Sequence, residues 1–216
     1  MIEAILPAAV AVAEADAEER PVALFPEEEA AIARAVPKRR LEFAVGRDCA
    51  HRALGALGEA PGPVPTGERG EPVWPAGVVG SITHCDGYRG CAVARTTDLA
   101  ALGIDAEPHA PLPAGLIDDI ARPEERGPLA ALAAADPSIH WDRLLFSAKE
   151  SVYKAWFPLA RRWLGFEDVV ATIDPGGTFA ARLLVPGPVV AGTALAGFEG
   201  RWLVTDGLVA TAIAIR

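Results

Sequence analysis

Two Asp-Gly dipeptides in this chain are followed by the same alanine spacing. Residues 86–94 and residues 206–214 share the pattern D-G-x-x-x-x-A-x-A. Asp-Gly is a common two-residue turn between antiparallel strands, so each copy predicts a β-hairpin. A hairpin that recurs in both parts of the chain suggests a fold of two similar α+β halves. Coincidence is the alternative explanation, because alanine is abundant in this sequence.

The rest of the chain alternates helical and strand-like segments. Helices are expected, with breaks near the prolines inside them, over residues 27–59 (Pro37), 113–135 (Pro123) and 147–159. Strands are expected over residues 78–83, 90–95, 99–104, 201–204 and 208–215. Residues 61–77 are rich in Pro and Gly, which break both regular structures, and should form a loop.

The composition describes a folded protein without structural disulfides. Of the 216 residues, 51% are hydrophobic and 23% are charged, which excludes a disordered or fibrous chain. Three cysteines without a C-x-x-C pair exclude a disulfide scaffold and a cysteine-rich zinc module, and they fit a reducing compartment. Neither a secretory signal nor a bilayer-spanning stretch is visible. We therefore expect a cytoplasmic protein that makes no membrane contact.

Charge is distributed unevenly along the chain. The formal net charge is −9, yet residues 34–52 and residues 143–162 are both basic, and acidic residues are concentrated in residues 14–29. An acidic chain with two basic segments favours binding of a small polyanion. Nucleic-acid binding usually requires a broad positive surface, so no nucleic-acid partner is expected. Solvated helix faces are the alternative explanation for both basic segments.

Asp105 and Glu107 follow an apolar run and are two positions apart. Alternate residues of an extended chain point to the same side, so both carboxylates should leave the end of a buried strand together. Two like charges this close require a cation or a proton between them. Mg2+ suits such a pair, because it binds one or two carboxylates together with substrate phosphate oxygens. A solvated strand end with two surface acids is the alternative.

Residues 146–154 (F-S-A-K-E-S-V-Y-K) predict a helix that carries Glu150 and Lys154 on one face. In the functional interpretation this face presents a carboxylate and an ammonium group to a cleft. Two simpler interpretations are also open. Ser147 and Glu150 have the spacing of a capping box at a helix start. Glu150 and Lys154 have the i, i+4 spacing of a surface ion pair.

Residues 80–86 (G-S-I-T-H-C-D) end a predicted strand. Thr83 and His84 could donate hydrogen bonds to phosphate oxygens there, or His84 could simply pack against the turn. Ser81 or Cys85 with His84 would instead suit an acyl hydrolase, although the nucleophile-elbow pattern G-x-S-x-G is absent. The glycine patterns of phosphate loops and dinucleotide-binding folds are absent too, which argues against an ATPase, GTPase or dehydrogenase.

Taken together, these motifs resemble those of one enzyme family. Residues 103–107 (G-I-D-A-E) and residues 146–154 resemble the two signature motifs of 4′-phosphopantetheinyl transferases, and residues 81–85 resemble the family's S-x-[ST]-H motif. The sequence is most similar to the long, monomeric Sfp-type branch, and to its actinobacterial members in particular. The likeness extends to further segments, namely residues 38–47, 70–75, 140–142 and 154–159.

The resemblance implies a fold and a reaction. The fold is an α+β pseudo-dimer of two similar α/β halves with the active site at their interface, and we expect the halves to span residues 1–103 and 104–216. The reaction is Mg2+-dependent transfer of 4′-phosphopantetheine from coenzyme A to a serine of an acyl, peptidyl or aryl carrier protein, which releases 3′,5′-ADP. Mn2+ is an alternative ion, and a monomer is expected.

The resemblance also assigns roles to individual residues. Asp105, Glu107 and Glu150 would hold the metal ion on the pyrophosphate of CoA. Glu150 would also act as general base on the serine, and Lys154 would stabilise charge on the leaving phosphate. Arg69 stands in the Gly/Pro loop where many relatives have a lysine. The residues expected to bind CoA are Arg39 and Arg47 for its 3′-phosphate, Thr83 and His84 for its other phosphates, and Arg69, Asp105, Lys149 and Lys154.

The second basic segment would serve the carrier protein. The family docks an acidic carrier helix, which residues 143–162 could receive together with exposed Trp156, Phe157 or Trp163. Two other functions remain open at this point. One is a metal-independent acyl hydrolase built on Ser81 or Cys85 with His84, and the other is a non-catalytic module that binds CoA or a carrier.

Overall fold

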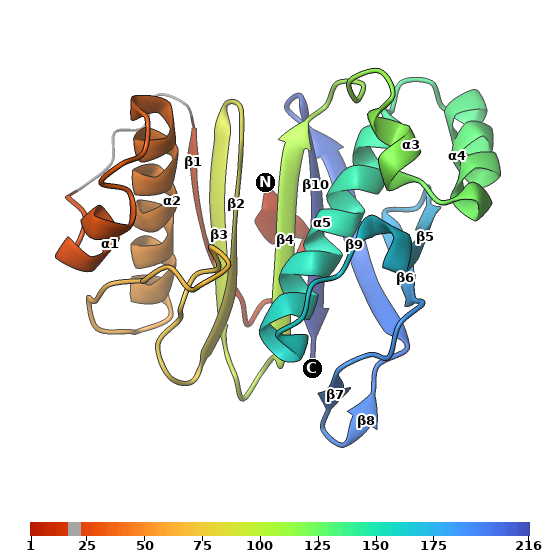
Figure 1. The fold of residues 1–216 in the computed structure, drawn as a ribbon. Coiled ribbons are helices and arrows are strands. Elements are labelled where there is room, and N and C mark those ends of the chain that lie inside the picture. Colours follow the sequence, from red (N-terminus) through yellow and green to blue (C-terminus); the bar gives the residue numbers. More distant parts are fainter. Residues whose placement is uncertain (17–22) are drawn as a thin grey trace.

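The computed structural model describes residues 1–16 and 23–216, which form two halves that lie side by side (Figure 1). The N-terminal half is a three-stranded antiparallel sheet of order β1-β3-β2 with the long helix α2 packed on it. Its elements, in chain order, are η1 (Ile2–Ile5), β1 (Ala11–Asp16), α1 (Pro26–Ala31), α2 (Pro37–Ala56), β2 (Val78–Cys85) and β3 (Tyr88–Arg95).

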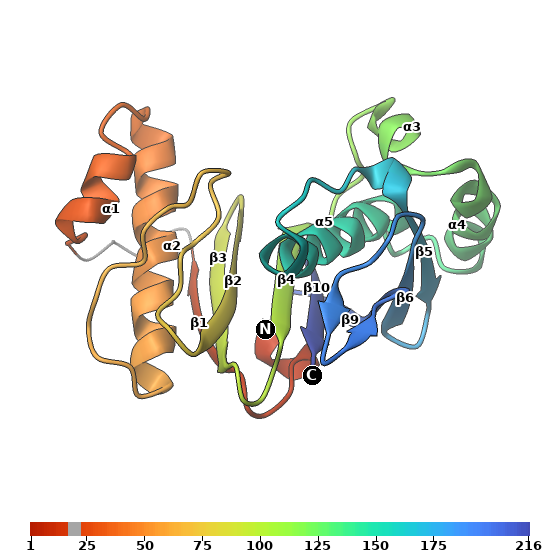
Figure 2. The same cartoon turned by 60° about the horizontal axis from the view of Figure 1, so that its bottom comes forward.

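The C-terminal half is a five-stranded antiparallel sheet of order β4-β10-β9-β6-β5, covered on one face by the long helix α5 (Figure 2). Its helices are α3 (Leu116–Ile120), α4 (Pro123–Ala135), α5 (Trp141–Ala160) and the 3-10 turn η2 (Phe166–Asp168). Its strands are β4 (Ala101–Pro108), β5 (Val169–Asp174), β6 (Thr178–Leu183), β9 (Gly197–Thr205) and β10 (Leu208–Ile215), with β7 (Val189–Val190) and β8 (Thr193–Ala194) paired separately.

The two sheets repeat one topology. In each half the first strand pairs with the last strand, which forms a hairpin with the strand before it, giving β1-β3-β2 and β4-β10-β9. The two Asp-Gly turns close these equivalent hairpins. Gly87 and Gly207 have φ angles of 80° and 75°, a conformation that side chains with a Cβ rarely adopt, which explains the glycine in both turns. The expected pseudo-dimer of two α/β halves is confirmed.

Three apolar clusters hold the molecule together. One lies between α2 and the N-terminal sheet, and another lies between α5 and the C-terminal sheet. The third lies between the halves and includes Ile2 of η1, Leu102 and Ile104 of β4, and Ala92 of β3. The halves therefore share a buried interface, and both chain ends lie beside it (Figures 1 and 2).

Gly103 lets α5 approach β4 closely. A Cβ at this position would collide with the backbone of Ser151 and Ala155 on α5. The glycine of the G-I-D-A-E motif is therefore required for packing, and it allows the helix that carries Glu150 to lie directly beside the strand that carries Asp105.

Strand β4 differs from the expected strand at residues 99–104. It runs from Ala101 to Pro108 and pairs with β10 along its whole length. Asp105 and Glu107 therefore lie inside a strand and not beyond its end. Because β4 belongs entirely to the C-terminal sheet, the structural division between the halves falls at residues 96–100 and not between residues 103 and 104.

Helix positions agree better with the sequence than strand positions do. The expected breaks are confirmed, because α2 and α4 each start with a proline, at Pro37 and Pro123. Helix α5 begins at Trp141 instead of at residue 147. Strands β1, β5 and β6 were not predicted, and part of the acidic segment, residues 17–22, lies outside the described residues. In the described ranges, no helix has the length and apolar character needed to cross a membrane.

Candidate active site

Side chains of β2 bridge to the backbone of β4 where the two halves meet. Ser81 Oγ accepts a hydrogen bond from Ile104 N (3.1 Å), and Thr83 Oγ1 accepts one from Ala106 N (3.0 Å). Residues 81 and 83 point to the same side of β2, so both hydroxyls reach the edge of the second sheet. This bridge fixes Asp105, which lies between the two bonded residues of β4.

Asp105 is buried at this junction with one carboxylate oxygen engaged and one unpartnered. Oδ1 accepts hydrogen bonds from the Thr83 hydroxyl (3.2 Å) and from Lys154 Nζ (2.7 Å). Oδ2 is buried and has no hydrogen-bond partner among the described residues, which fits an atom that binds a cation or a ligand. Thr83 orients Asp105, so its single O–H is not free for the phosphate contact expected from the sequence.

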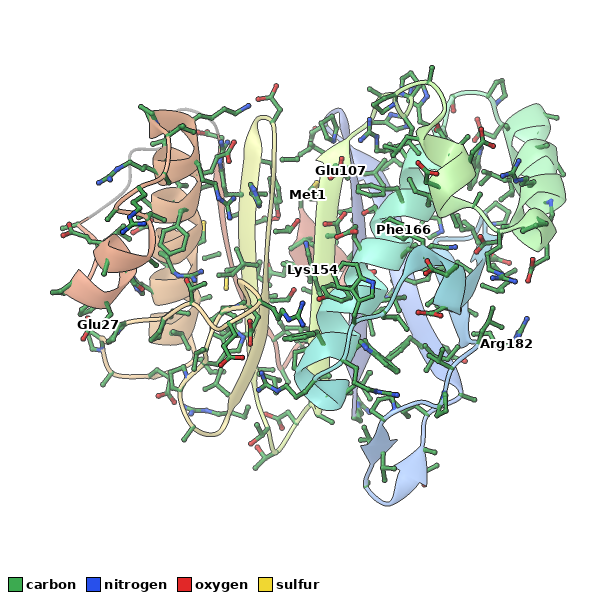
Figure 3. The ribbon with its side chains drawn as sticks, in the orientation of Figure 1. Met1, Glu27, Glu107, Lys154, Phe166 and Arg182 are labelled. Carbon is green, nitrogen blue, oxygen red and sulfur yellow. The ribbon has the colours of Figure 1, made fainter. Side chains whose placement is uncertain are left out.

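Two further carboxylates lie near Asp105, those of Glu150 on α5 and Glu107 on β4. Burial raises the pKa of both side chains above the usual range, and the charge of Asp105 raises it further. Lys154 opposes this shift in the pKa of Glu150. Glu107 Oε2 accepts a hydrogen bond from Arg143 (2.8 Å). Figure 3 shows Glu107 and Lys154 beside β4, where the halves meet.

The two simpler interpretations of Glu150 are wrong. Ser147 lies well inside α5, and its hydroxyl contacts Thr211 Oγ1 (3.0 Å), so it does not cap a helix start. Lys154 pairs with Asp105, and no ion pair between Lys154 and Glu150 forms in the described part of the chain. Glu150 is therefore a half-buried carboxylate in a cluster of acids.

The carboxylates fit a divalent cation whose coordination shell is completed by substrate oxygens. Among the described residues, no group of three or more His, Cys, Asp or Glu side chains is placed to hold a metal ion by itself. Mg2+ commonly takes one or two carboxylates and fills its shell with water and phosphate oxygens. Asp105 Oδ2 and the nearby Glu150 provide such a partial set. Glu107 was expected as a third ligand, but one of its oxygens is engaged by Arg143.

A basic cavity of about 290 Å³ lies on α2, beside β2. Arg39 and His84 line it, with Arg39 NH1 3.0 Å from His84 Nε2, and the carboxylate of Glu42 in the same lining lies 3.8 Å from each of them. Arg47 is buried, lies over the Phe43 ring at 4.3 Å, and donates to Thr66 Oγ1 (3.1 Å). Its Nε is buried and has no hydrogen-bond partner within the described ranges. Burial lowers the pKa of Arg47, so an anion in this cavity would stabilise its charge.

A second cavity of about 240 Å³ connects this basic end to the carboxylates. Glu150 and Lys154 line it together with Arg69 of the loop before β2. The residues that line both cavities are Gly70, Pro72 and Ile82. The two cavities are therefore neighbours along one groove that runs from α2 to α5.

Lys149 is not brought to this groove. Its ammonium group lies in the core of the C-terminal half, where it donates to Glu125 Oε2 at 2.8 Å. It also contacts three backbone carbonyl oxygens, those of Ile120, Phe166 and Val169. Burial lowers the pKa of Lys149, and the adjacent Glu125 opposes that shift. This placement corrects the expected role of Lys149 in binding CoA.

Thr66 was assigned no role from the sequence, and Arg143 was expected only as part of the carrier-docking segment, yet both contribute to the site. Thr66 accepts from Arg47, and Arg143 donates to Glu107 and to the carbonyl oxygens of Ala110 and Pro111. These partners are 19 and 36 residues apart in the chain, so no local pattern marks them. The one general rule that points to them is that a buried charged group, such as Arg47 or Glu107, needs a hydrogen-bonding partner.

Two family models match most of the chain. Residues 27–94 match the N-terminal domain of 4′-phosphopantetheinyl transferases, and residues 101–203 match the 4′-phosphopantetheinyl transferase superfamily. This chain belongs to the 4′-phosphopantetheinyl transferase superfamily. The two matches are separated at the connection between β3 and β4, where the structure divides into its halves.

Similar proteins from actinobacteria are named for the same activity. The chain is 59% identical over 219 residues to the 4′-phosphopantetheinyl transferase Svp of Streptomyces mobaraensis, covering 100% of this chain and 89% of that one. It is 46% identical to PptT of Mycobacterium tuberculosis, with 100% and 98% coverage. Enterobactin synthase component D of Escherichia coli K12 is 38% identical over 120 residues, which is 55% of each chain. The protein is therefore an enzyme of phosphopantetheine transfer.

The hydrolase interpretation does not suit this phosphopantetheinyl transferase. Ser81 is buried, and its hydroxyl accepts the bond from β4. Burial, with the charges of Glu107 and Asp105, raises the pKa of Cys85 to about 12. The Cys85 thiol is therefore protonated at neutral pH and a poor nucleophile.

Proposed function

We propose that this enzyme binds coenzyme A along the groove and transfers its 4′-phosphopantetheine to a serine of an acyl, peptidyl or aryl carrier protein, with release of 3′,5′-ADP. The observation that carries the proposal is the order of charges in the groove. Arg39 and Arg47 line one end, and Lys154 and Glu150 line the other. CoA presents a 3′-phosphate and then a pyrophosphate, so its anions match the two cationic positions.

The basic cavity suits the 3′-phosphate. Arg47 brings a buried guanidinium with an unpartnered Nε, and Arg39 adds a second, more exposed cation. His84 lines this cavity too, and burial together with the cations Arg39 and Lys154 lowers the pKa of His84. A neutral imidazole still donates one hydrogen bond, which suits a pyrophosphate oxygen. Arg69 would add a cation at the second cavity.

In the transfer, the serine oxygen forms a bond to the phosphorus that carries pantetheine. The bond from that phosphorus to the bridging pyrophosphate oxygen breaks, and this oxygen leaves with the electron pair on 3′,5′-ADP. Glu150 takes the serine proton, directly or through water. Lys154, held by Asp105 at 2.7 Å, stabilises the charge that develops on the leaving phosphate.

A magnesium ion fits the carboxylate end of the groove. Asp105 and Glu150 would hold it, with Glu107 as the third carboxylate, and Mn2+ is an alternative ion. When bound, the ion would neutralise charge on the pyrophosphate. Asp105 Oδ2 supports this assignment, since a buried carboxylate oxygen without a hydrogen-bond partner within the described ranges suits a metal ligand.

The carrier protein would dock next to the second cavity. Most of the basic segment 143–162 is engaged inside the molecule, and its exposed cations are Arg161 and Arg162. Trp163 follows them, is 70% exposed, and contacts Tyr153 at the cavity with a ring-centre distance of 5.1 Å. Of the three aromatic residues considered for docking, Trp163 alone is exposed, because the others are buried, namely Trp156 and Phe157.

Mass spectrometry of an apo-carrier protein incubated with CoA, Mg2+ and this enzyme tests the proposal. We expect the carrier to gain one phosphopantetheine and 3′,5′-ADP to appear in equal amount. Omission of Mg2+ with added chelator should stop both. A protein that binds CoA but leaves the carrier unmodified would instead be the non-catalytic module considered above.

A further inference from the structure

Glu28 on α1 is completely buried, and no role in the reaction has been assigned to it. Its carboxylate accepts three hydrogen bonds. Phe25 N donates to Oε2 (3.0 Å), while Val64 N and His51 Nε2 donate to Oε1 (2.8 Å each). A carboxylate only accepts, so the three donors converge on it without competition. Glu28 thereby joins three segments: α1, α2 and the loop between α2 and β2.

The loop that Glu28 holds carries two of the three residues that line both cavities, Gly70 and Pro72. After Val64 the chain folds back on itself through a bridge between Thr66 and Pro72 and a hydrogen bond from Val73 N to Pro65 O (2.9 Å). Thr66 fixes Arg47 in the basic cavity. Other loop residues that line the groove are Arg69, Gly70, Glu71, Pro72 and Trp74.

The bond to Glu28 is the anchor of this folded loop. Residues 61–77 belong to no helix or named strand. In the described part of the chain, the backbone hydrogen bonds of residues 65–73 lie within the loop itself, so they fold the loop without attaching it to the rest of the protein. Val64 is itself fully buried, and its N–H would be buried without a partner if Glu28 turned away. The carboxylate therefore determines where the loop starts, and through it where Thr66 meets Arg47.

We propose that Glu28 is a positioning residue for coenzyme A, which holds the loop of residues 64–73 in the conformation that binds the ligand. This inference rests on the proposed binding of CoA in the groove. Glu28 lines neither cavity, and it acts on the first one through the loop and through its charge on Arg47. Its effect should therefore be on affinity for CoA and not on the rate of the chemical step.

The test is Glu28→Gln, with CoA affinity measured by calorimetry and turnover measured at saturating CoA. An amide has one acceptor atom and one donor group, so at least one of the three donors will face the NH2 group. We expect the Kd for CoA to rise about tenfold or more, the size of one lost charge-assisted hydrogen bond, with kcat unchanged. Hydrogen exchange should become faster at the amides of residues 64–73.

Glu125→Gln is a matched control in the other half. Glu125 is also buried at the third position of a short helix and also accepts three hydrogen bonds, from Arg122 N, Lys149 Nζ and Ala171 N. In this variant too, at least one of the three donors faces the NH2 group of the glutamine, but at a position away from the loop of residues 64–73. We expect it to lower Tm more than Glu28→Gln does, because the buried Lys149 loses its counter-charge, but to leave the Kd for CoA at the wild-type value.

An unchanged Kd for CoA in Glu28→Gln, or a lower kcat at unchanged Kd, would overturn the proposal. If this variant fails to fold, Glu28→Asp replaces it, because Asp retains the charge and withdraws it from Val64 by one methylene. An unchanged Kd for CoA in Glu28→Asp, with or without a lower kcat, would equally overturn the proposal. Wild-type enzyme that does not bind CoA would instead refute the proposed function itself. Because the wild type is measured first, the two failures are distinguishable.

Discussion

The two halves of this enzyme each contain one buried glutamate that ties a short helix to a long one. Glu28 lies in α1 and Glu125 lies in α4, and both helices start with Pro-Glu-Glu. Each glutamate accepts a bond from the backbone of the residue before the proline, from Phe25 N and Arg122 N. Together with the paired Asp-Gly turns, this is a second sequence echo between equivalent parts of the pseudo-dimer.

The partners of the two glutamates differ. Glu28 binds His51 of α2, whose side chain is 22% exposed, and the loop that lines the groove. Glu125 binds Lys149 of α5, whose side chain is 1% exposed, and the backbone of β5. The same device thus anchors the loop that lines the groove in one half and the helix of Glu150 in the other. The comparison predicts that the N-terminal half controls affinity for CoA, while the C-terminal half controls stability and rate.

The largest effect is expected from Lys149→Met. Removing the cation leaves Glu125 buried without its counter-charge, and broken buried pairs typically cost about 3–5 kcal/mol. We expect denaturant unfolding to show a loss of that order, while the Kd for CoA stays the same because Lys149 lies outside the groove. A stable variant with weaker CoA binding would show that Lys149 does reach the ligand.

The double variant Lys149→Met with Glu125→Gln is the control for that experiment. It removes the unpaired charge along with the cation, so part of the lost stability should return. An additive loss would mean that the pair contributes little and that the packing of the lysine stem dominates.

Glu150→Gln tests the catalytic side of the comparison. The change removes the proposed base and a negative charge at the metal site, while it keeps the side-chain size. We expect a folded protein that still binds CoA but transfers phosphopantetheine at least about 100-fold more slowly. Raising the Mg2+ concentration should recover only the part of the loss that is due to metal binding. Near-normal turnover at modest Mg2+ would shift the role of base to a water held by Asp105 and Glu107.

Arg47→Ala tests the ligand-binding side. A hydrogen bond to a charged group typically contributes about 1.5–3 kcal/mol, so we expect roughly 10- to 100-fold weaker CoA binding. Dephospho-CoA lacks the 3′-phosphate and should lose much less. Arg40→Ala removes a cation of the same helix that does not line the cavity, and it should affect neither ligand. Equal losses for both ligands in Arg47→Ala would remove the assignment of this arginine to the 3′-phosphate.

The sequence was most informative where residues close in the chain decide the structure. Pro37 and Pro123 fix the starts of two helices, and Gly87 and Gly207 fix two turns. Residues of the three motifs, Thr83, Asp105 and Lys154, meet at one junction, which the resemblance implied because a known family carries long-range information that local patterns lack.

Prediction failed where distant segments decide. Strand β1 forms because it pairs with β3, more than 70 residues further along the chain, and its own composition gives no strand signal. Lys149 was expected in the site because it belongs to the motif of residues 146–154, next to Glu150. Successive residues of a helix point about 100° apart, so Lys149 faces α4 and β5 while Glu150 faces the groove.

The smallest predicted effect concerns docking of the carrier protein, which should involve neither of the two buried glutamates. Arg161 and Arg162 are exposed, and exposed charge pairs contribute about 0.2–1 kcal/mol, screened over roughly 10 Å at 0.1 M salt. We expect the KM for an acidic carrier protein to rise roughly two- to fivefold between low and high salt, with the Kd for CoA less affected because its partners are more buried.

Trp163→Ala should raise the carrier KM at every salt concentration. Val189→Ala, an equally exposed apolar residue on β7, should not. A carrier KM that ignores salt but depends on Trp163 would mean that docking is mainly apolar.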